Sequence, residues 1–384
     1  MLPLLDKDPV WIDTNAGLEK TIADISNQPL LAVDTESNSL YAYRERVCLI
    51  QISTPATDYL IDTLAFTDLS QLAPFFANPA QQKIFHAAEY DLICLKRDYS
   101  FTFANIFDTM VAARILGETQ VGLGALLFEN FSILQEKKYQ RANWGKRPLP
   151  PEMLDYARMD THYLFALKTL IEDKLIQQDL WGLAQEDFVL VSEVSPNGTD
   201  SNGNSCWKVA GNVRLSSSQS AILFSLCAFR DQQARKLDLP LFKVFPNEQL
   251  LEISQAAPHT RLELQQVRGM SPRLLDRYAD GLLKAVVVGE SSPPPLRPLH
   301  NRPDTAMLER LKALHQWRKV QAKSMGVESD VVLSRDFMES IAIKNPANLS
   351  VLKKIMSRIP WRYEHFGDAI LRTIHPLEEH ENPL

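Results

Sequence analysis

The sequence predicts an α/β domain, with a mixed sheet and flanking helices, followed by two all-α domains. Three observations predict this fold class. Short strand-like runs gather in the first third of the chain, while helical spacing of apolar residues dominates afterwards. In addition, the C-terminal half matches itself without a gap when it is shifted by 88 residues, the interval from Leu226 to Leu314.

The N-terminal domain begins with three closely spaced strands, because apolar, β-branched runs at 30–36, 46–53 and 58–62 are separated only by turn residues. A fourth strand at 83–85 leads directly into a helix over about residues 87–99, and 105–107 gives a fifth. Apolar spacing then predicts helices at 109–116, 123–131 and 152–170. Hairpin strands followed by alternating strand and helix indicate a mixed sheet.

Two segments of linker composition divide the chain. Residues 195–204 have almost no apolar side chain to bury, and 289–303 contain three successive prolines at 293–295 that favour an extended spacer. The predicted parts are the α/β domain 1–190, the linker 191–214, the first helical domain 215–288, the proline-rich linker 289–303, the second helical domain 304–376 and the tail 377–384.

The two helical domains are predicted to be copies of one fold. Under the shift of 88 residues, arginines, alanines, prolines and aliphatic residues coincide in type, for example Arg230 with Arg318, Ala234 with Ala322 and Pro272 with Pro360. Each copy is long enough to bury a core of its own. The pattern therefore indicates a duplicated domain and not a solenoid.

Composition limits the class of protein. With 384 residues, 45% hydrophobic and 23% charged, the chain has an ordinary globular balance, and its longest apolar runs are far shorter than the roughly 18–20 residues of a membrane span. The N-terminus shows no basic leader, so we expect a cytoplasmic protein without a membrane partner. Its four cysteines, Cys48, Cys94, Cys206 and Cys227, are scattered, and we expect them to be reduced and mostly buried.

The charge is unevenly distributed. The net charge is −6, yet residues 302–375 hold 13 Lys and Arg against 8 Asp and Glu, which leaves −11 for the remainder. A carboxylate-rich metal centre in one part and a basic docking surface in another would produce this asymmetry, and so would ordinary solvated faces.

Asp34 and Glu36 lie two residues apart on the first predicted strand, so their side chains project from the same face. Two neighbouring carboxylates beside a sheet are costly unless a positive charge lies between them, which makes this pair a candidate metal site. The alternative is an ordinary strand end at the protein surface.

Two further places in the domain carry candidate acids. Tyr156 and Asp160 are four residues apart and therefore share one face of a predicted helix. Asp91 stands where a helix leaves a strand, a frequent place for functional residues. Glu89, Asp98 and Asp108 compete with Asp91, but Asp108 directly precedes a helical run and is better explained as a helix cap.

Together these motifs resemble the tyrosine subclass of the DEDD exonucleases, which implies a ribonuclease H-like fold. The order is D-T-E at 34–36, H-x-x-x-Y-D-L at 86–92, which contains His86 and Asp91, and Y-A-x-x-D-x-x-Y-L at 156–164, which contains Tyr156 and Asp160 and ends at Tyr163 and Leu164. Residues 107–109 and 144–149 also match the family, whereas Ser37 departs from it, because an aromatic residue often follows D-T-E.

The repeated domains resemble HRDC domains. The resemblance is carried by an F/W-R-x-x-x-A pattern at Phe229, Arg230 and Ala234, and again at Trp317, Arg318 and Ala322. An exonuclease domain followed by two HRDC domains is the arrangement of the ribonuclease D family. The resemblance thus covers nearly the whole chain and implies a 3′–5′ exoribonuclease that acts in the maturation of transfer RNA or other stable RNA.

The resemblance also implies roles for the acids. Asp34 would bridge two divalent ions, Glu36 and Asp160 would complete one site, and Asp91 would help to hold the other through water. Tyr156 would orient the attacking water, and the products would be nucleoside 5′-monophosphates. An all-oxygen ligand set without Cys or His favours Mg²⁺ or Mn²⁺.

RNA is the expected partner, through single-stranded 3′ ends such as those of transfer-RNA precursors. His86 is one candidate contact, with a structural role as its alternative. The others are the basic and aromatic residues ahead of the last motif, namely Arg141, Trp144, Lys146 and Arg147. For the last four, a solvated basic loop is the alternative. Two other functions stay open, a 3′–5′ DNA exonuclease and a non-catalytic HRDC scaffold that binds nucleic acid. Nothing in the sequence predicts the oligomeric state.

Overall fold

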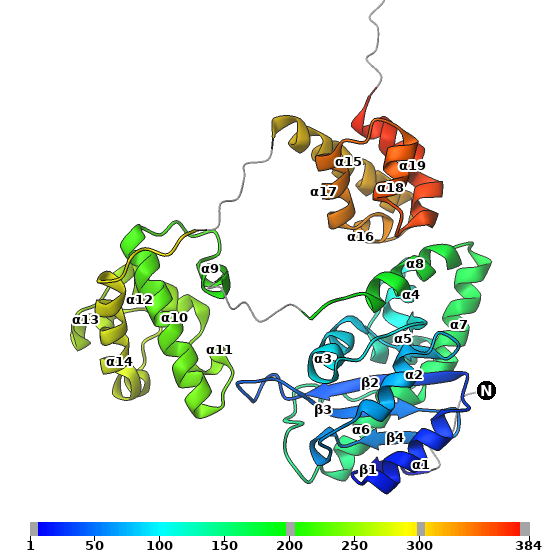
Figure 1. The fold of residues 1–384 in the computed structure, drawn as a ribbon, viewed down its shortest axis with the longest axis horizontal. Helices are drawn as coiled ribbons and strands as arrows, with labels where there is room; N and C mark the ends of the chain where they lie inside the picture. Colours follow the sequence, from blue (N-terminus) through cyan, green and yellow to red (C-terminus); the bar gives the residue numbers. More distant parts are fainter. Residues whose placement is uncertain (1–6, 197–203, 298–303, 377–384) are drawn as a thin grey trace, which may run out of the picture. The chain divides into compact units, whose positions relative to one another are not determined.

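The computed structural model describes residues 7–196, 204–297 and 304–376, and the labels of its elements are those of Figure 1. These residues form two compact units. One unit contains the α/β domain together with the second helical domain. The other contains the first helical domain together with residues 37–46, the segment that follows the strand of Asp34 and Glu36.

The α/β domain is built on a six-stranded sheet in the order β1-β4-β3-β2-β5-β6. β3 and β4 pair antiparallel, whereas β1 with β4, β2 with β5, and β5 with β6 pair parallel. The sheet is therefore mixed, as predicted. The strands are β1 (Val10–Ile12), β2 (Leu30–Ser37), β3 (Val47–Ser53), β4 (Asp58–Ile61), β5 (Gln82–Phe85) and β6 (Ile106–Asp108).

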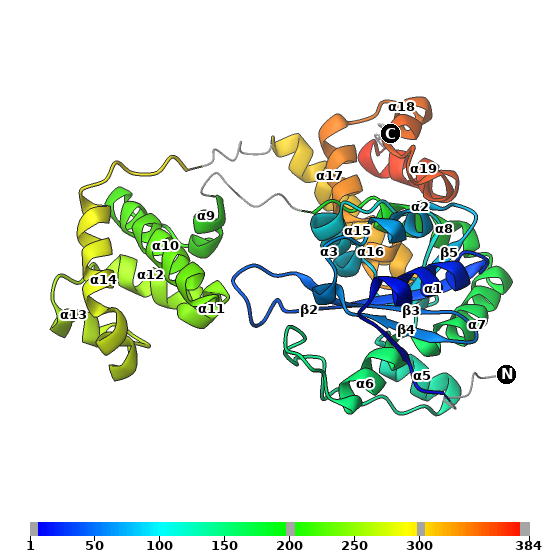
Figure 2. The same cartoon turned by 60° about the horizontal axis from the view of Figure 1, so that its bottom comes forward.

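Helices cover this sheet (Figures 1 and 2). α3 and α6 both pack on β3, a strand that is buried along its whole length, and α7 and α8 pack on β5 and β6. The helices of this domain are α1 (Asn15–Ile25), α2 (Ala73–Ala77), α3 (Glu89–Tyr99), α4 (Thr109–Ile115), α5 (Leu123–Phe131), α6 (Pro151–His162), α7 (Leu164–Gln177) and α8 (Trp181–Ser192).

The first helical domain has its own hydrophobic core around Leu226 and Phe245. Its helices are α9 (Asn204–Ala210), α10 (Ser217–Leu237), α11 (Leu241–Val244), α12 (Asn247–Ala256), α13 (Arg261–Gln266) and α14 (Pro272–Glu290). α9 falls inside the predicted linker 191–214, so that part of the linker prediction is wrong. Most of the polar segment 195–204 lies outside the described residues.

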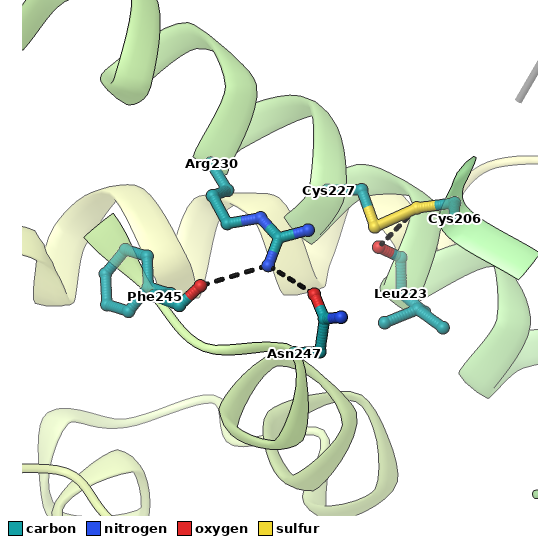
Figure 3. Close-up of a disulfide and its surroundings, with 6 residues drawn as sticks. All are labelled: Cys206, Leu223, Cys227, Arg230, Phe245 and Asn247. Atoms are coloured by element: carbon teal, nitrogen blue, oxygen red, sulfur yellow. Dashed lines mark hydrogen bonds between the residues drawn. A yellow bond between two sulfur atoms is a disulfide. The ribbon is translucent and has the colours of Figure 1, made fainter. Parts of the chain in front are cut away.

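The expectation of four reduced cysteines is also wrong, because Cys206 and Cys227 form a disulfide (Figure 3). The bond joins α9 to α10, and α9 was not predicted. Cys48 and Cys94 are buried and form no disulfide among the described residues, as expected. In the same view Arg230 donates to the carbonyl oxygen of Phe245 at 3.0 Å.

Arg318 in the second copy makes the corresponding bond to the carbonyl oxygen of Leu333 at 2.9 Å. Because both guanidinium groups bind carbonyls of their own domain, the repeated arginines support the fold.

Reduction of the disulfide is expected to destabilise the first helical domain by about 3 kcal/mol, because the bond closes a loop between residues 21 positions apart. Thermal unfolding with and without dithiothreitol measures the difference. In the Cys206→Ser/Cys227→Ser variant the reductant should have no effect. Equal stability of the oxidised and reduced wild-type protein would contradict the prediction.

The second helical domain has the corresponding helices α15 (Thr305–Met325), α16 (Ser329–Val332), α17 (Arg335–Lys344), α18 (Leu349–Ile355) and α19 (Pro360–Ile374). It is fixed to the α/β domain through α19 and α8. Arg362, only 3% exposed, pairs with Glu186 and Asp187 at 2.9 Å each, and the Glu186 carboxylate also accepts a hydrogen bond from the backbone N–H of Arg362.

Within the described ranges, no helix is long and apolar enough to cross a membrane.

Candidate active site

The predicted acids from β2 and α6 come together. Asp34 and Glu36 project from the same face of β2, and Asp160 lies in the last turns of α6. One carboxylate oxygen of each residue lies within 4.8 Å of the others. The three side chains are partly buried, so the cluster is still open to solvent on one side.

Asp91 lies beside this cluster, in the first turn of α3. Its carboxyl is 6% exposed and accepts a hydrogen bond from the Thr35 hydroxyl, the residue between Asp34 and Glu36. It is not one of the three grouped acids. Its negative charge nevertheless raises the pKa of Asp34, which places it within electrostatic reach of the cluster.

The pKa of every carboxyl in the cluster is raised. Burial is the largest cause for Asp34 and Glu36, followed by the charges of the neighbouring acids, and both pKa values lie well above their ordinary range. Burial likewise raises the pKa of Asp91 and of Asp160 to about 7 each, although hydrogen bonds from Thr35 and Gln135 oppose the shift. The acids therefore form a site that a cation would stabilise.

Tyr156 lies one helical turn before Asp160, as predicted, and its ring packs against Tyr139 and Trp144 with centroid distances of 5.9 and 6.1 Å. Burial raises the pKa of this phenol above its ordinary value, and the charges of Asp160, Glu36 and Asp34 raise it further. Tyr156 is therefore protonated at neutral pH. It can donate or accept a hydrogen bond, but it is a poor general base.

Asp34, Glu36 and Asp160 line a cavity of about 420 Å³ together with Tyr156, whereas Asp91 is not among its lining residues. Three lining residues, Gln135, Lys137 and Gln140, come from the segment ahead of α6 and were not predicted. The Gln135 amide donates to Asp160 Oδ1 at 2.5 Å, so this segment orients one of the acids. The sequence offered only proximity to the last motif as a signal, since the segment has no regular periodicity that would show which side chains face inward.

His86 also lines the cavity, and its Nδ1 lies 2.9 Å from the Thr109 hydroxyl. Burial lowers the pKa of His86 to about 4, so its imidazole is neutral at pH 7. This position is compatible with both roles considered for it, a structural group and a substrate contact. Substrate contact by His86 stays a prediction.

The other predicted substrate contacts divide into two pairs. Trp144 is only 1% exposed and packs in the core beside α6, so the prediction that it contacts RNA is wrong. Arg147 holds the Asp62 carboxylate at 2.6 Å and the Cys48 carbonyl at 2.7 Å, which gives it a structural role. Arg141 and Lys146 are exposed, and nucleic-acid contact by them stays a prediction.

Asp108 is a helix cap, as predicted. It precedes α4 and accepts hydrogen bonds from the backbone N–H groups of Met110 and Val111, and also from those of Ala87 and Ala88 ahead of α3. This carboxyl therefore holds the turn from which Asp91 projects. These four hydrogen bonds stabilise the buried Asp108 carboxylate, so its burial requires no metal ion.

Comparisons with known proteins agree with this geometry. A family model described as a 3′–5′ exonuclease matches residues 9–176, and an HRDC domain model matches residues 219–286 and 307–374. The exosome complex exonuclease RRP6 of Saccharomyces cerevisiae is 41% identical over 176 residues, which cover 45% of this chain and 24% of that protein. The chain spans less than half the length of the curated relatives it matches.

Solved structures support the same arrangement. The catalytic core of RRP6 from Trypanosoma brucei is 28% identical with a TM-score of 0.63, covering 76% of this chain and 83% of that one. RNase D of Escherichia coli, at 22% identity, shares the fold with a TM-score of 0.67 over 96% of this chain and 99% of that one. The chain thus combines a 3′–5′ exonuclease domain with two HRDC domains, and it is similar to RRP6 in sequence and to RNase D in fold.

Proposed function

We propose that this protein is a 3′–5′ exoribonuclease that removes nucleotides from single-stranded RNA ends as nucleoside 5′-monophosphates. The observation that carries the proposal is the convergence of Asp34, Glu36 and Asp160 within 4.8 Å, with Tyr156 on the same helix face as Asp160. These are the positions that the family motifs assign to the reaction. The RNA preference is supported by the similarity to RRP6.

The residues fit two divalent cations, which we propose to be Mg²⁺ or Mn²⁺. The donor atoms are carboxylate oxygens only. Burial and the charges of neighbouring acids raise the pKa values of these carboxyls, and no positively charged side chain within the cluster of described residues neutralises them. Asp34, Glu36, Asp91 and Asp160 would hold the ions. When bound, such ions lower the pKa of water and stabilise the charge on a phosphodiester undergoing displacement.

The other residues of the cavity would position the substrate. The protonated Tyr156 hydroxyl is placed to hold the attacking water through a hydrogen bond, and Gln135 keeps the Asp160 carboxylate oriented. Lys137 supplies a positive charge to the cavity wall, where a phosphate would enter. Neutral His86 offers a ring nitrogen to the same space.

The proposal is tested by incubating the protein with matched single-stranded RNA and DNA, each labelled at the 5′ end, with and without Mg²⁺. We expect stepwise shortening of RNA from its 3′ end only when Mg²⁺ is present. Preferential shortening of DNA would favour the alternative DNA exonuclease. Binding of either strand without any Mg²⁺-dependent shortening would favour the non-catalytic scaffold and would end the proposal.

Replacing Tyr156 by Phe is expected to lower kcat by about 10- to 100-fold with little change in KM, because the hydroxyl orients the water and the ring still packs. Steady-state cleavage of an RNA oligonucleotide measures both constants. Tyr139→Phe is the matched control, since it removes the hydroxyl of the neighbouring ring, and it should retain wild-type kcat. A Tyr156→Phe enzyme with normal kcat would remove this role.

The natural RNA substrate and the cellular compartment are also part of this proposal. Transfer-RNA precursors and other stable RNAs with single-stranded 3′ ends fit an enzyme that must thread a free end into an acidic cavity. We further propose that the protein acts in the cytoplasm. The Cys206–Cys227 disulfide is the observation that opposes this proposal, because cytoplasmic reductants keep most thiols reduced.

A further inference from the structure

Thr35 lies between the two acids of β2, but its side chain serves the other face of the sheet. Side chains alternate along a strand, so Thr35 projects away from the face that carries Asp34 and Glu36. On that opposite face Val33, two residues earlier, belongs to the same core cluster as Leu92 of α3. Thr35 is also one of the residues that line the cavity, and it was not among the predicted site residues.

The Thr35 hydroxyl binds Asp91, the candidate metal ligand that comes from α3. It donates a hydrogen bond to Oδ1 of the Asp91 carboxyl. Because Asp91 is only 6% exposed, water competes poorly for this bond. The strand that carries two of the acids is therefore joined, through the residue between them, to an acid on a separate helix.

The backbone ahead of Asp91 is held by a different group. Asp108 accepts hydrogen bonds from the N–H groups of Ala87 at 3.0 Å and of Ala88 at 2.7 Å, in the turn that leads into α3. Ala87 has a φ of 64°, which a residue other than glycine keeps only when its surroundings hold it there. With the backbone fixed, the freedom left to Asp91 is rotation of its side chain. The Thr35 hydroxyl restricts that rotation.

Asp160, the other acid outside β2, is held in the same manner. Its Oδ1 accepts a hydrogen bond from the Gln135 amide at 2.5 Å. Each acid that a helix supplies is thus bound by a neutral donor, an amide in one case and a hydroxyl in the other. A neutral donor orients a carboxylate without cancelling the negative charge that attracts a cation, and such outer partners are usual in metal sites.

We propose that Thr35 is a positioning residue, whose hydroxyl holds the Asp91 carboxylate where it helps to bind the second of the two divalent ions. This inference rests on the proposed two-ion exonuclease function and assigns one more residue to it. Thr35 acts through Asp91 and not by ligating an ion. The loss of such an outer partner typically lowers metal affinity or activity by about 10- to 100-fold. The effect should therefore fall on one ion and not on both.

The test is Mn²⁺ binding by the Thr35→Val variant, which loses the hydroxyl but keeps the branched shape that suits a strand. Electron paramagnetic resonance of free Mn²⁺ during a titration gives the number of bound ions and the Kd of each, without any cleavage reaction. We expect the wild-type protein to bind two ions. In Thr35→Val one of the two Kd values should rise by about 10- to 100-fold, and the other should stay within about twofold of wild type.

Two variants serve as controls. Thr35→Ser returns the hydroxyl, so both of its Kd values should stay close to those of the wild-type protein. Thr63→Val removes a hydroxyl that is also buried and that donates to the carbonyl oxygen of Val47 at 2.7 Å, but Thr63 does not line the cavity, so this variant should bind both ions normally. Thermal unfolding verifies that each variant is folded. If Thr35→Val does not fold, Thr35→Ala removes the same hydroxyl.

A double variant tests whether Thr35 acts through Asp91. Asp91→Asn should weaken the binding of one ion at least as much as Thr35→Val does. The Thr35→Val/Asp91→Asn variant should bind Mn²⁺ no more weakly than Asp91→Asn alone, because the hydroxyl then has no carboxylate to hold. A further loss in the double variant would mean that Thr35 acts on another group, and the inference would be overturned.

RNA cleavage by the same variants separates this inference from the function on which it rests. Thr35→Val should lower kcat with little change in KM, and a higher Mg²⁺ concentration should restore kcat by filling the weakened site. If the wild-type protein binds two ions and cleaves RNA but Thr35→Val keeps both Kd values, this inference alone fails. A wild-type protein that binds two ions without cleaving RNA would end the proposed function, and one that binds fewer than two ions would end both.

Discussion

Replacing Asp34 by Asn is expected to lower kcat/KM for RNA cleavage by at least about 1000-fold, with the fold intact. Asp34 is the central acid of the cluster, because the charges of Glu36, Asp91 and Asp160 all raise its pKa. Asn keeps the shape but removes the charge that would hold the divalent ions, so positioning and charge stabilisation are lost together. Steady-state kinetics at saturating Mg²⁺ measures the loss.

Glu89→Gln is the control for this prediction. Glu89 is an exposed acid two residues from Asp91 and competed with it in the sequence, but it faces solvent. Its loss should leave kcat/KM within about twofold of wild type, as is usual for a surface substitution. Circular dichroism and thermal unfolding verify that both variants fold. Wild-type turnover by folded Asp34→Asn protein would mean that these acids do not form the reaction centre.

The elements that carry the acids could be predicted because their local patterns agree with their final environment. β2 and β3 are apolar strands that become buried, and Tyr156 and Asp160 keep helical spacing in α6. Residue spacing within one strand or helix fixes which side chains share a face. The approach of Asp91 and Asp160 to β2 is a tertiary result, and it was reached only through the family motifs.

The predictions that failed concern residues whose environment is set by tertiary contacts and not by the composition of the local segment. Trp144 lies in an irregular segment rich in basic residues that predicts RNA contact, yet it is buried in the core beside α6. The disulfide between Cys206 and Cys227 was not predicted, because Cys206 lies on α9, a short helix in a segment that was predicted to be a linker. Burial of single side chains in irregular segments depends on distant neighbours, which one sequence does not reveal.

The docking of the second HRDC domain shows the same limit. Arg362 pairs with Glu186 and Asp187, but the shift of 88 residues places Leu274 at its equivalent in the first copy. The repeat predicted two similar folds and could not predict that one copy would bind the exonuclease domain through a buried ion pair. Differences between the copies, more than their similarity, therefore indicate their separate roles.

Without divalent ions, the stability of the α/β domain is expected to fall as the pH rises from about 4 to about 7. An unfolded aspartate ionises near 3.8, whereas burial raises the pKa of folded Asp91 and Asp160 to about 7. Between these values the folded state binds more protons than the unfolded state, so raising the pH favours unfolding. A shift of about three units corresponds to about 4 kcal/mol for one such carboxyl, and the coupled pair is not additive.

His86 acts in the opposite direction over part of this range. Because burial lowers its pKa to about 4, its neutral form adds stability that grows as the pH rises from 4 towards 6.5. One imidazole cannot cancel a cluster of four raised carboxyls, so the net change stays negative. The loss should continue from pH 6.5 to just above 7, where Asp91 and Asp160 complete their ionisation.

Urea unfolding in EDTA at pH 5 and pH 8 measures this loss, and Mg²⁺ at pH 8 should restore most of it, because ligands that bind only the folded state stabilise it. Asp160→Asn is the diagnostic variant. It removes one of the titrating groups, so its stability in EDTA should depend less on pH and should respond less to Mg²⁺. A wild-type stability that rises from pH 5 to pH 8 in EDTA would show that these carboxyls do not crowd one another in solution.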